Sequence, residues 1–248
     1  MVTTLALVAV ATAVSLAVRH VMGFGFSLTF VPLASLFLAT REVVLAAILL
    51  EILLGAALAF ELRQDLRLRE SLQLQAASLI GIVAGIGLLH RVSQALLFEL
   101  CLVPMLAAAV LLCVRPEFTI RRSRAKLLAA GVLSGTLNVW ASFSGPPVAL
   151  YYLATEASAR SVKGMLAGYF LLLYLCTAGA LAITGDYGGF TGWPVVVAAA
   201  VTIAALYPLS RALARAAEPW FRKLAAWFLL LVAAAALVKA LLTPVPPG

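Results

Sequence analysis

The stretch "RHVMGFGFS", residues 19–27, decides how the chain is interpreted. Arg19 and His20 end an almost wholly apolar run that starts at residue 2, and two glycines and a serine separate them from the next apolar run. An apolar run that breaks beside a positive charge, at a point rich in glycine, predicts a helix interrupted within a membrane.

The composition is that of an integral membrane protein. Of the 248 residues, 64% are hydrophobic and only 11% are charged, whereas soluble domains are about half apolar and about a quarter charged. The N-terminus lacks the basic region of a secretory signal and is expected to be mature sequence. In a membrane protein, a net charge of +8 reflects the topology of the loops more than a nucleic-acid partner. We therefore expect the lipid bilayer as a partner and do not expect nucleic acid. Scattered cysteines and two distant histidines predict no metal site and no cofactor.

Ten apolar runs follow one another along the chain, and none alternates with a period of two. We therefore expect an all-α, polytopic membrane protein and not a barrel. Most runs are long enough to cross a bilayer, and the pairs around Gly23 and Ser144 are shorter. The runs lie at about 2–18, 24–39, 43–60, 72–89, 95–114, 127–140, 145–154, 162–183, 193–210 and 224–243.

The two halves of the chain resemble each other. Residues 24–44 can be laid on residues 143–163 without a gap, so that Phe24 meets Phe143. A break, an arginine and a later turn recur in the same order, which favours a duplication over a chance match of apolar segments. We predict one transmembrane domain over 1–248, with repeat one at about 1–114, a basic cytoplasmic linker at 115–126 and repeat two at about 127–248.

The loop charges favour a broken or re-entrant helical hairpin at the start of each half. If each hairpin enters the membrane and returns, fourteen Lys and Arg residues fall on one side, and only Arg41, Arg91 and Lys239 fall on the other. Continuous spans would divide the same loops nine against eight. The positive-inside rule therefore predicts inverted repeats with both termini outside the cytoplasm.

Each break is expected to expose the N-terminus of a short helix. Ser27 and Ser144 sit where an N-cap is expected, and Pro146 and Pro147 suit a first helical turn. Helix N-termini carry unpaired N–H groups and the positive end of the helix dipole. Two such termini that enter from opposite faces would form one site for a small anion, in which equivalent substitutions give similar defects. The alternative is that each break is a packing kink.

Polar groups inside the apolar runs complete the candidate site. Glu51 is the candidate for a coupling proton, since it lies in the middle of its run and Glu99 could lie near a helix end. Arg19 either adds its charge to the site or extends to the cytoplasmic surface, and Asn138 either lines the site or joins helices. The substrate-binding candidates are Arg19, Gly23, Gly25, Ser27, Asn138, Ser142, Ser144 and Gly145.

At these residues the chain resembles the TauE/SafE sulfite exporter family, also called the TSUP family. The resemblance rests on Gly23 and Gly25 followed by Val31-Pro32-Leu33, and in the second half on the turn that ends in Gly145 and Pro146. It covers nearly the whole chain and implies a plasma-membrane carrier of sulfite, organosulfonates or similar anions. Serine replaces two glycines of the family pattern in the second turn, and Phe26 and Ser27 replace glycines in the first.

Two other classes of function remain open. "SFSG" at 142–145 could hold the nucleophile of an intramembrane serine hydrolase, with His20 or His90 as its base. A membrane scaffold or assembly protein is the second alternative. The sequence leaves the oligomeric state open, a homodimer included.

Overall fold

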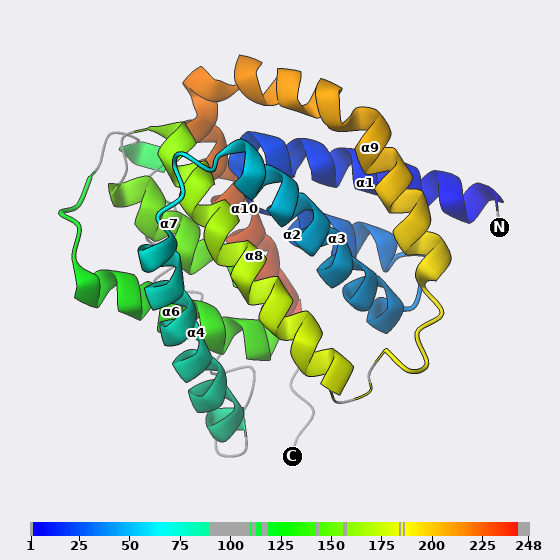
Figure 1. The fold of residues 1–248 in the computed structure, drawn as a ribbon, viewed down its shortest axis with the longest axis horizontal. Helices are drawn as coiled ribbons and strands as arrows, with labels where there is room; N and C mark the ends of the chain where they lie inside the picture. Colours follow the sequence, from blue (N-terminus) through cyan, green and yellow to red (C-terminus); the bar gives the residue numbers. More distant parts are fainter. Residues whose placement is uncertain are drawn as a thin grey trace. The chain divides into compact units, whose positions relative to one another are not determined.

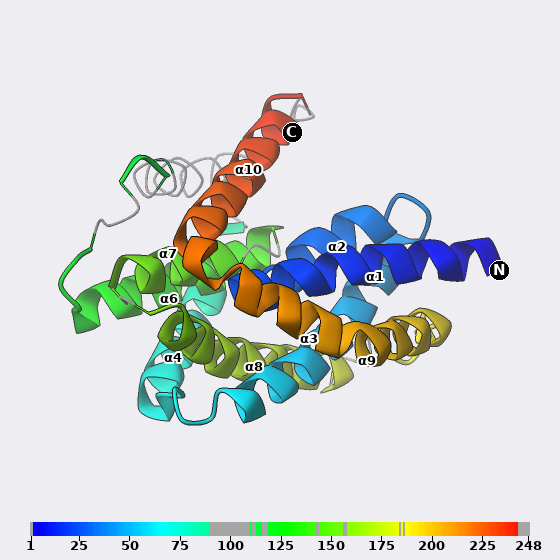
Figure 2. The ribbon, with the colours of Figure 1, turned by 90° about the horizontal axis from the view of Figure 1, so that it is seen from above.

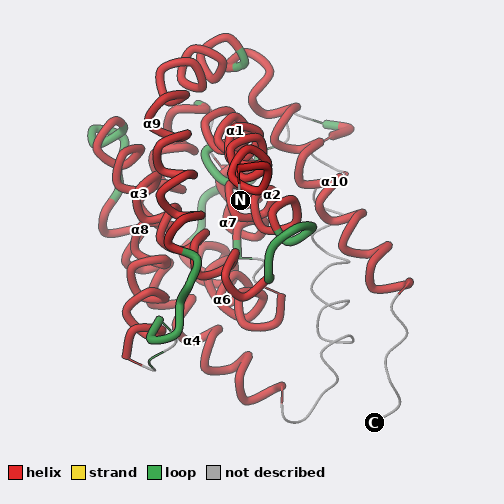
Figure 3. The backbone as a smooth tube through the Cα atoms, turned by 90° about the vertical axis from the view of Figure 1, so that its right-hand side faces the viewer, coloured by secondary structure: helices red, strands yellow, loops and turns green. Residues whose placement is uncertain are grey.

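The computed structural model describes residues 2–89, 110, 113–115, 119–141, 144–155, 158–183, 185 and 187–242. Within these residues every long element is an α-helix and no strand occurs, as Figure 3 shows. The expected all-α fold is confirmed. The chain forms two compact units, the first made of Met1–Leu68 and Lys163–Pro219, and the second of Arg69–Val162 and Trp220–Gly248.

The first unit contains the helices that are long and apolar enough to cross a membrane. They are α1 (Val2–Met22), α3 (Thr40–Glu61), α8 (Ala159–Ile183) and α9 (Trp193–Ala216), and they establish a polytopic membrane protein. The fifth helix, α2 (Phe26–Ala34), has nine residues. Its length of about 14 Å is less than half of a hydrocarbon core about 30 Å thick.

Three of these helices run in the same direction. The backbone N–H of Thr191, just before α9, donates to Glu42 Oε2 in the first turn of α3 at 2.9 Å. At the opposite ends of the same two helices, Arg211 Nη2 and Glu61 Oε1 form an ion pair at 2.6 Å. Helix α1 packs along α9 in the same sense (Figures 1 and 2). Because α1 and α3 are parallel, the α1–α2 pair must return the chain to its starting side, as the predicted hairpin requires.

Helix α8 runs opposite to α3. A Cβ atom on Gly55 would lie 3.4 Å from the Cα of Leu171, well inside α8. A Cβ on Gly164, near the start of α8, would lie 2.9 Å from the Cβ of Asp65, just after the end of α3. The gapless superposition of the halves pairs α3 with α8, so their opposite directions are those that an inverted duplication requires.

Helix boundaries recur at equivalent positions of the two halves. In the superposition that pairs Phe24 with Phe143, three boundaries of the first half fall on boundaries of the second. They are the ends of α1 and α6 (Met22, Ala141), the starts of α2 and α7 (Phe26, Gly145), and the starts of α3 and α8 (Thr40, Ala159). This coincidence supports the predicted repeat.

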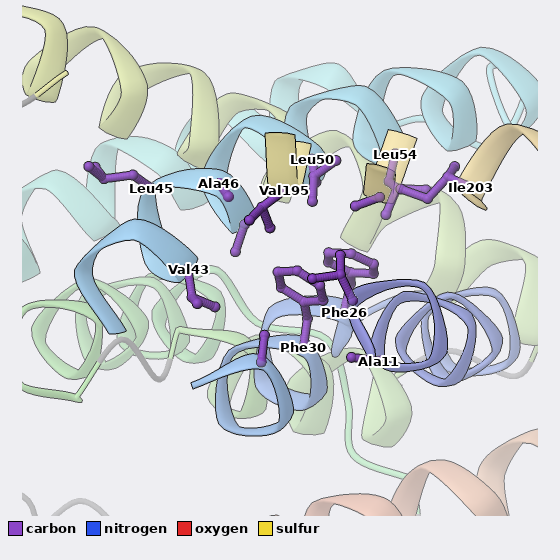
Figure 4. Close-up of a cluster of buried hydrophobic side chains, with 14 of the residues drawn as sticks. Ala11, Phe26, Phe30, Val43, Leu45, Ala46, Leu50, Leu54, Val195 and Ile203 are labelled. Carbon is purple, nitrogen blue, oxygen red and sulfur yellow. The ribbon is translucent and has the colours of Figure 1, made fainter. Parts of the chain in front are cut away.

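Helix α2 is held by the apolar core of the first unit. The rings of Phe26 and Phe30 are fully buried and stack at 5.2 Å between centroids. Figure 4 shows both rings pointing toward side chains of α3 and α9, among them Leu50 and Val195. Burying two such rings stabilises the position of a helix too short to be stable alone, and so fixes the helix start that follows the first break.

The second unit is built on close contact between two helices. It contains α4 (Leu68–Leu89), α6 (Arg124–Ala141), α7 (Gly145–Thr155) and α10 (Phe221–Leu242), with a 3₁₀ turn, η1 (Glu218–Trp220), at its edge. Ser78 Oγ of α4 donates to the Gly131 carbonyl of α6 at 3.1 Å, and Thr136 Oγ1 donates to the Gly81 carbonyl at 3.0 Å. These glycines let the two backbones approach, because a Cβ at either position would collide with the facing helix.

Candidate functional site at the first helix break

Two glycines in a left-handed conformation make the first break. Gly23 has φ 79° and Gly25 has φ 95°, backbone conformations that glycine adopts without steric cost. The N–H of Gly23 closes α1 by donating to the Arg19 carbonyl at 2.7 Å, and the N–H of Thr29 opens α2 by donating to the Gly25 carbonyl at 3.2 Å. Gly25 is therefore the N-cap residue of α2. The expectation that Ser27 would be the N-cap is wrong, because the turn closes two residues earlier.

Ser27 instead binds a carboxylate from α3. Its backbone N–H donates to Glu51 Oε1 at 3.1 Å, and its hydroxyl donates to the same oxygen at 2.9 Å. The Tyr174 hydroxyl of α8 donates in turn to Ser27 Oγ at 3.4 Å. Only 2% of Glu51 is exposed, so its side chain faces the protein interior. A carboxyl group thus lies at the N-terminus of α2, where the helix dipole favours negative charge.

Arg19 lies on the other side of the same carboxylate. Its Nη1 is 3.5 Å from Glu51 Oε2, and its Cζ lies 5.6 Å from the centroid of the Phe170 ring. With 2% of its surface exposed, Arg19 does not extend to the surface, and that alternative is wrong. Among the described residues, its Nε and Nη2 have no hydrogen-bond partner. A buried guanidinium with unused donors is costly unless a ligand binds it.

His20 takes part in a separate cluster at the end of α1. Its Nδ1 lies 3.2 Å from the Leu16 carbonyl, and its ring meets the Tyr207 ring edge-on at 4.8 Å between centroids. The Tyr207 hydroxyl donates to Glu61 Oε2 at 3.3 Å. Through these contacts His20 is a hydrogen-bonded neighbour of the site.

The second break lies between α6 and α7. Ser144 immediately precedes α7, and Pro146 and Pro147 stand in its first turn, as the sequence predicts. The Ser134 hydroxyl of α6 donates to the Ser144 carbonyl and ties the break to the preceding helix. Asn138 is half-buried near the end of α6. Ser142, His90 and Glu99 lie outside the described residues.

Two residues around Arg19 and Glu51 were not predicted from the sequence. Tyr174 and Phe170 belong to one long apolar run, in which neither stands out. The repeat gives one indication for Phe170, because the register that pairs Phe24 with Phe143 also pairs Glu51 with Phe170. No local pattern could assign Tyr174 to the first break.

The fold is that of a polytopic membrane protein, with a buried pair of opposite charges beside an interrupted helix. Residues 5–236 match the family described as Sulfite exporter TauE/SafE. Since this match covers most of the sequence, the chain belongs to that family, as its turns suggested. No curated protein and no solved structure matches the chain.

Proposed function

We propose that the protein is a secondary transporter that exports small sulfur-containing oxyanions, such as sulfite or organosulfonates, across the bacterial plasma membrane. The family match supports this substrate class. The observation that carries the site is the buried Arg19, whose Nε and Nη2 have no partner among the described residues, beside the N-terminus of α2.

An oxyanion suits this site in shape and in charge. The guanidinium is a planar fork of donors that matches two oxygens of one anion. The first N–H groups of α2 have no acceptor inside the helix, and its N-cap residue Gly25 has no side chain to cover them. Gly23 is covered by Lys163 of α8, whose Cγ would lie 2.8 Å from a Cβ at this position. The second break, with Asn138, Ser142, Ser144 and Gly145, stays a predicted source of further contacts.

The proposed orientation places both termini in the periplasm. In the first unit, α1, α3 and α9 end on the side that carries Arg63, Arg67 and Arg211, whereas Arg41 lies at the opposite end of α3. The positive-inside rule assigns the richer side to the cytoplasm. A cysteine at Thr119 in a cysteine-free background should react with an impermeant reagent only after permeabilisation. Equal labelling in intact cells would show that Thr119 faces the periplasm and would overturn the proposed orientation.

Flux into proteoliposomes tests the transport proposal. The anions are sulfite, methanesulfonate, sulfate, chloride and acetate, each with and without a proton gradient. We expect saturable flux of sulfite or methanesulfonate that Arg19→Gln abolishes and that the control Arg215→Gln retains, because Arg215 is exposed at the end of α9. Flux that Arg19→Gln leaves unchanged would place the substrate elsewhere, and the absence of flux for all anions would overturn the proposed function.

A further inference from the structure

The Glu51 carboxylate already fills the place that an anion would take. One of its oxygens accepts from the N–H and the hydroxyl of Ser27, and the other faces Arg19. These groups are the helix N-terminus and the buried cation on which the proposed function rests. The two oxygens of a carboxylate are spaced much like two oxygens of a sulfite or sulfonate group, so the same donors can serve either ligand.

We propose that Glu51 is a tethered competitor for the transported anion, which occupies the site until a proton neutralises it. This inference rests on the proposed function and adds a mechanism that determines when the anion can bind. A proton adds to one oxygen of the Glu51 carboxylate, the neutral carboxyl group leaves the donors, and the oxyanion takes its place. One negative charge replaces another beside Arg19, so each bound anion is accompanied by one proton.

The geometry of the ion pair supports this exchange. The distance of 3.5 Å between Arg19 Nη1 and Glu51 Oε2 exceeds the roughly 2.7–2.9 Å of a charge-assisted hydrogen bond. The guanidinium therefore lies near the carboxylate without forming a bidentate ion pair with it. A second anion beside an ionised Glu51 would meet strong repulsion in a site shielded from water, so the two anions exclude each other.

Few other groups could titrate in place of Glu51. Glu61, the next acidic residue of α3, is engaged by Arg211 and Tyr207 of α9 about 15 Å further along the helix. Among the described residues, the printed contacts of Glu51 are with Arg19 of α1 and Ser27 of α2, and the Tyr174 hydroxyl of α8 donates to Ser27. Two further titratable groups lie at the same break: Lys163 of α8, which packs against Gly23, and His20 of α1, which contacts Tyr207.

Binding of methanesulfonate to the purified protein tests the inference, because this anion keeps a single negative charge between about pH 5 and about pH 8. Calorimetry in buffers of different ionisation enthalpy gives both the affinity and the number of protons taken up. For the unaltered protein we expect uptake of close to one proton per anion at about pH 8, and affinity at least about tenfold weaker there than at about pH 5.

Glu51→Gln keeps the size of the side chain and removes its charge. It should bind methanesulfonate at least about tenfold more tightly than the unaltered protein at about pH 8, with no proton uptake and little dependence on pH. The matched control is Glu61→Gln, which changes the other acidic residue of α3 that pairs with an arginine. This control should keep the proton uptake and the pH dependence of the unaltered protein.

The outcomes separate the inference from the proposed function. If the unaltered protein binds without proton uptake, or if Glu51→Gln binds more weakly, Glu51 only supports the site and the inference fails while the transport proposal stands. If neither protein binds any oxyanion, the proposed function fails and the inference with it. If Glu51→Gln does not fold, the proton uptake of the unaltered protein decides alone.

Discussion

The two helix breaks share a backbone plan and differ in charge. Both join a long helix to a short one at equivalent positions of the halves. Among the described residues, a buried arginine beside a buried carboxylate is found at the first break and not at the second. In the gapless superposition, Asn138 takes the place of Arg19 and Phe170 takes the place of Glu51. The two breaks thus present two helix N-termini, and a buried ion pair lies beside the first of them.

Phe170 shows how the asymmetry serves the site. Although it replaces Glu51 in the second half, it lies in the first unit, with its ring beneath the Arg19 guanidinium. A second carboxylate at this position would neutralise Arg19 and close the site to a substrate anion. An aromatic face attracts the cation more weakly than a carboxylate does, so Arg19 stays available for an anion.

Replacing the charge of the first break should have the largest effect. Arg19→Gln removes a full charge and up to two charge-assisted hydrogen bonds, each of about 1.5–3 kcal/mol. Its affinity for methanesulfonate should therefore fall by at least about a hundredfold. The matched change in the second half, Asn138→Ala, should weaken binding by no more than about tenfold, because one neutral hydrogen bond contributes about 1 kcal/mol.

Folding must be controlled in this comparison, because Arg19→Gln leaves the Glu51 carboxylate buried without its cation. The double variant Arg19→Gln with Glu51→Gln removes both charges and should recover thermal stability without recovering affinity. Equal losses of affinity in Arg19→Gln and Asn138→Ala would show that the two breaks contribute equally to anion binding. That result would contradict the expectation that the charged first break contributes more.

Alanine at the glycines should separate the two breaks by stability. Gly25 has φ 95°, so Gly25→Ala should destabilise the protein by about 1–2 kcal/mol. Gly145 is the first residue of α7 and is not among the described glycines with positive φ, so Gly145→Ala should change stability little. The control is Gly179→Ala in α8, where an added Cβ meets no atom within 4 Å.

Thermal unfolding in detergent measures these differences. We expect Gly25→Ala to lower the melting temperature by several degrees, and both other variants to stay near the unaltered protein. A stable Gly25→Ala would show that the left-handed turn is not required, and the first break would then be a kink that other residues could form.

The sequence predicts the backbone of this site better than its contacts. Glycine, proline and charge mark where α1 ends and where α7 begins, because these residues act through local sterics and solvation. The burial of Glu51 follows from its place in the middle of an apolar run. The partners of Glu51 do not follow, since Arg19 and Ser27 approach it through tertiary packing. Tyr174 is 147 residues from Ser27 in the chain, and no local pattern joins them.

The smallest expected difference concerns the two serines. Ser27→Ala removes one of the two donors that Ser27 offers to Glu51 Oε1. A hydrogen bond to a charged group contributes about 1.5–3 kcal/mol, which alone would weaken an anion about ten- to a hundredfold. If Glu51 competes for the same donor, however, its own hold weakens as well, and the net loss of affinity for methanesulfonate should be only a few-fold. Ser144→Ala should weaken binding by no more than about tenfold, because it removes at most one neutral hydrogen bond of about 1 kcal/mol and keeps the Ser144 carbonyl that ties the second break. Binding of methanesulfonate at about pH 5 sharpens the test. If protonation removes Glu51 from this donor, as proposed, the loss in Ser27→Ala should grow there toward the full range of about ten- to a hundredfold. A loss in Ser27→Ala that is the same at low and high pH would mean that Glu51 and the substrate do not share this donor. A complete loss of function in Ser144→Ala would instead favour a serine nucleophile at the second break.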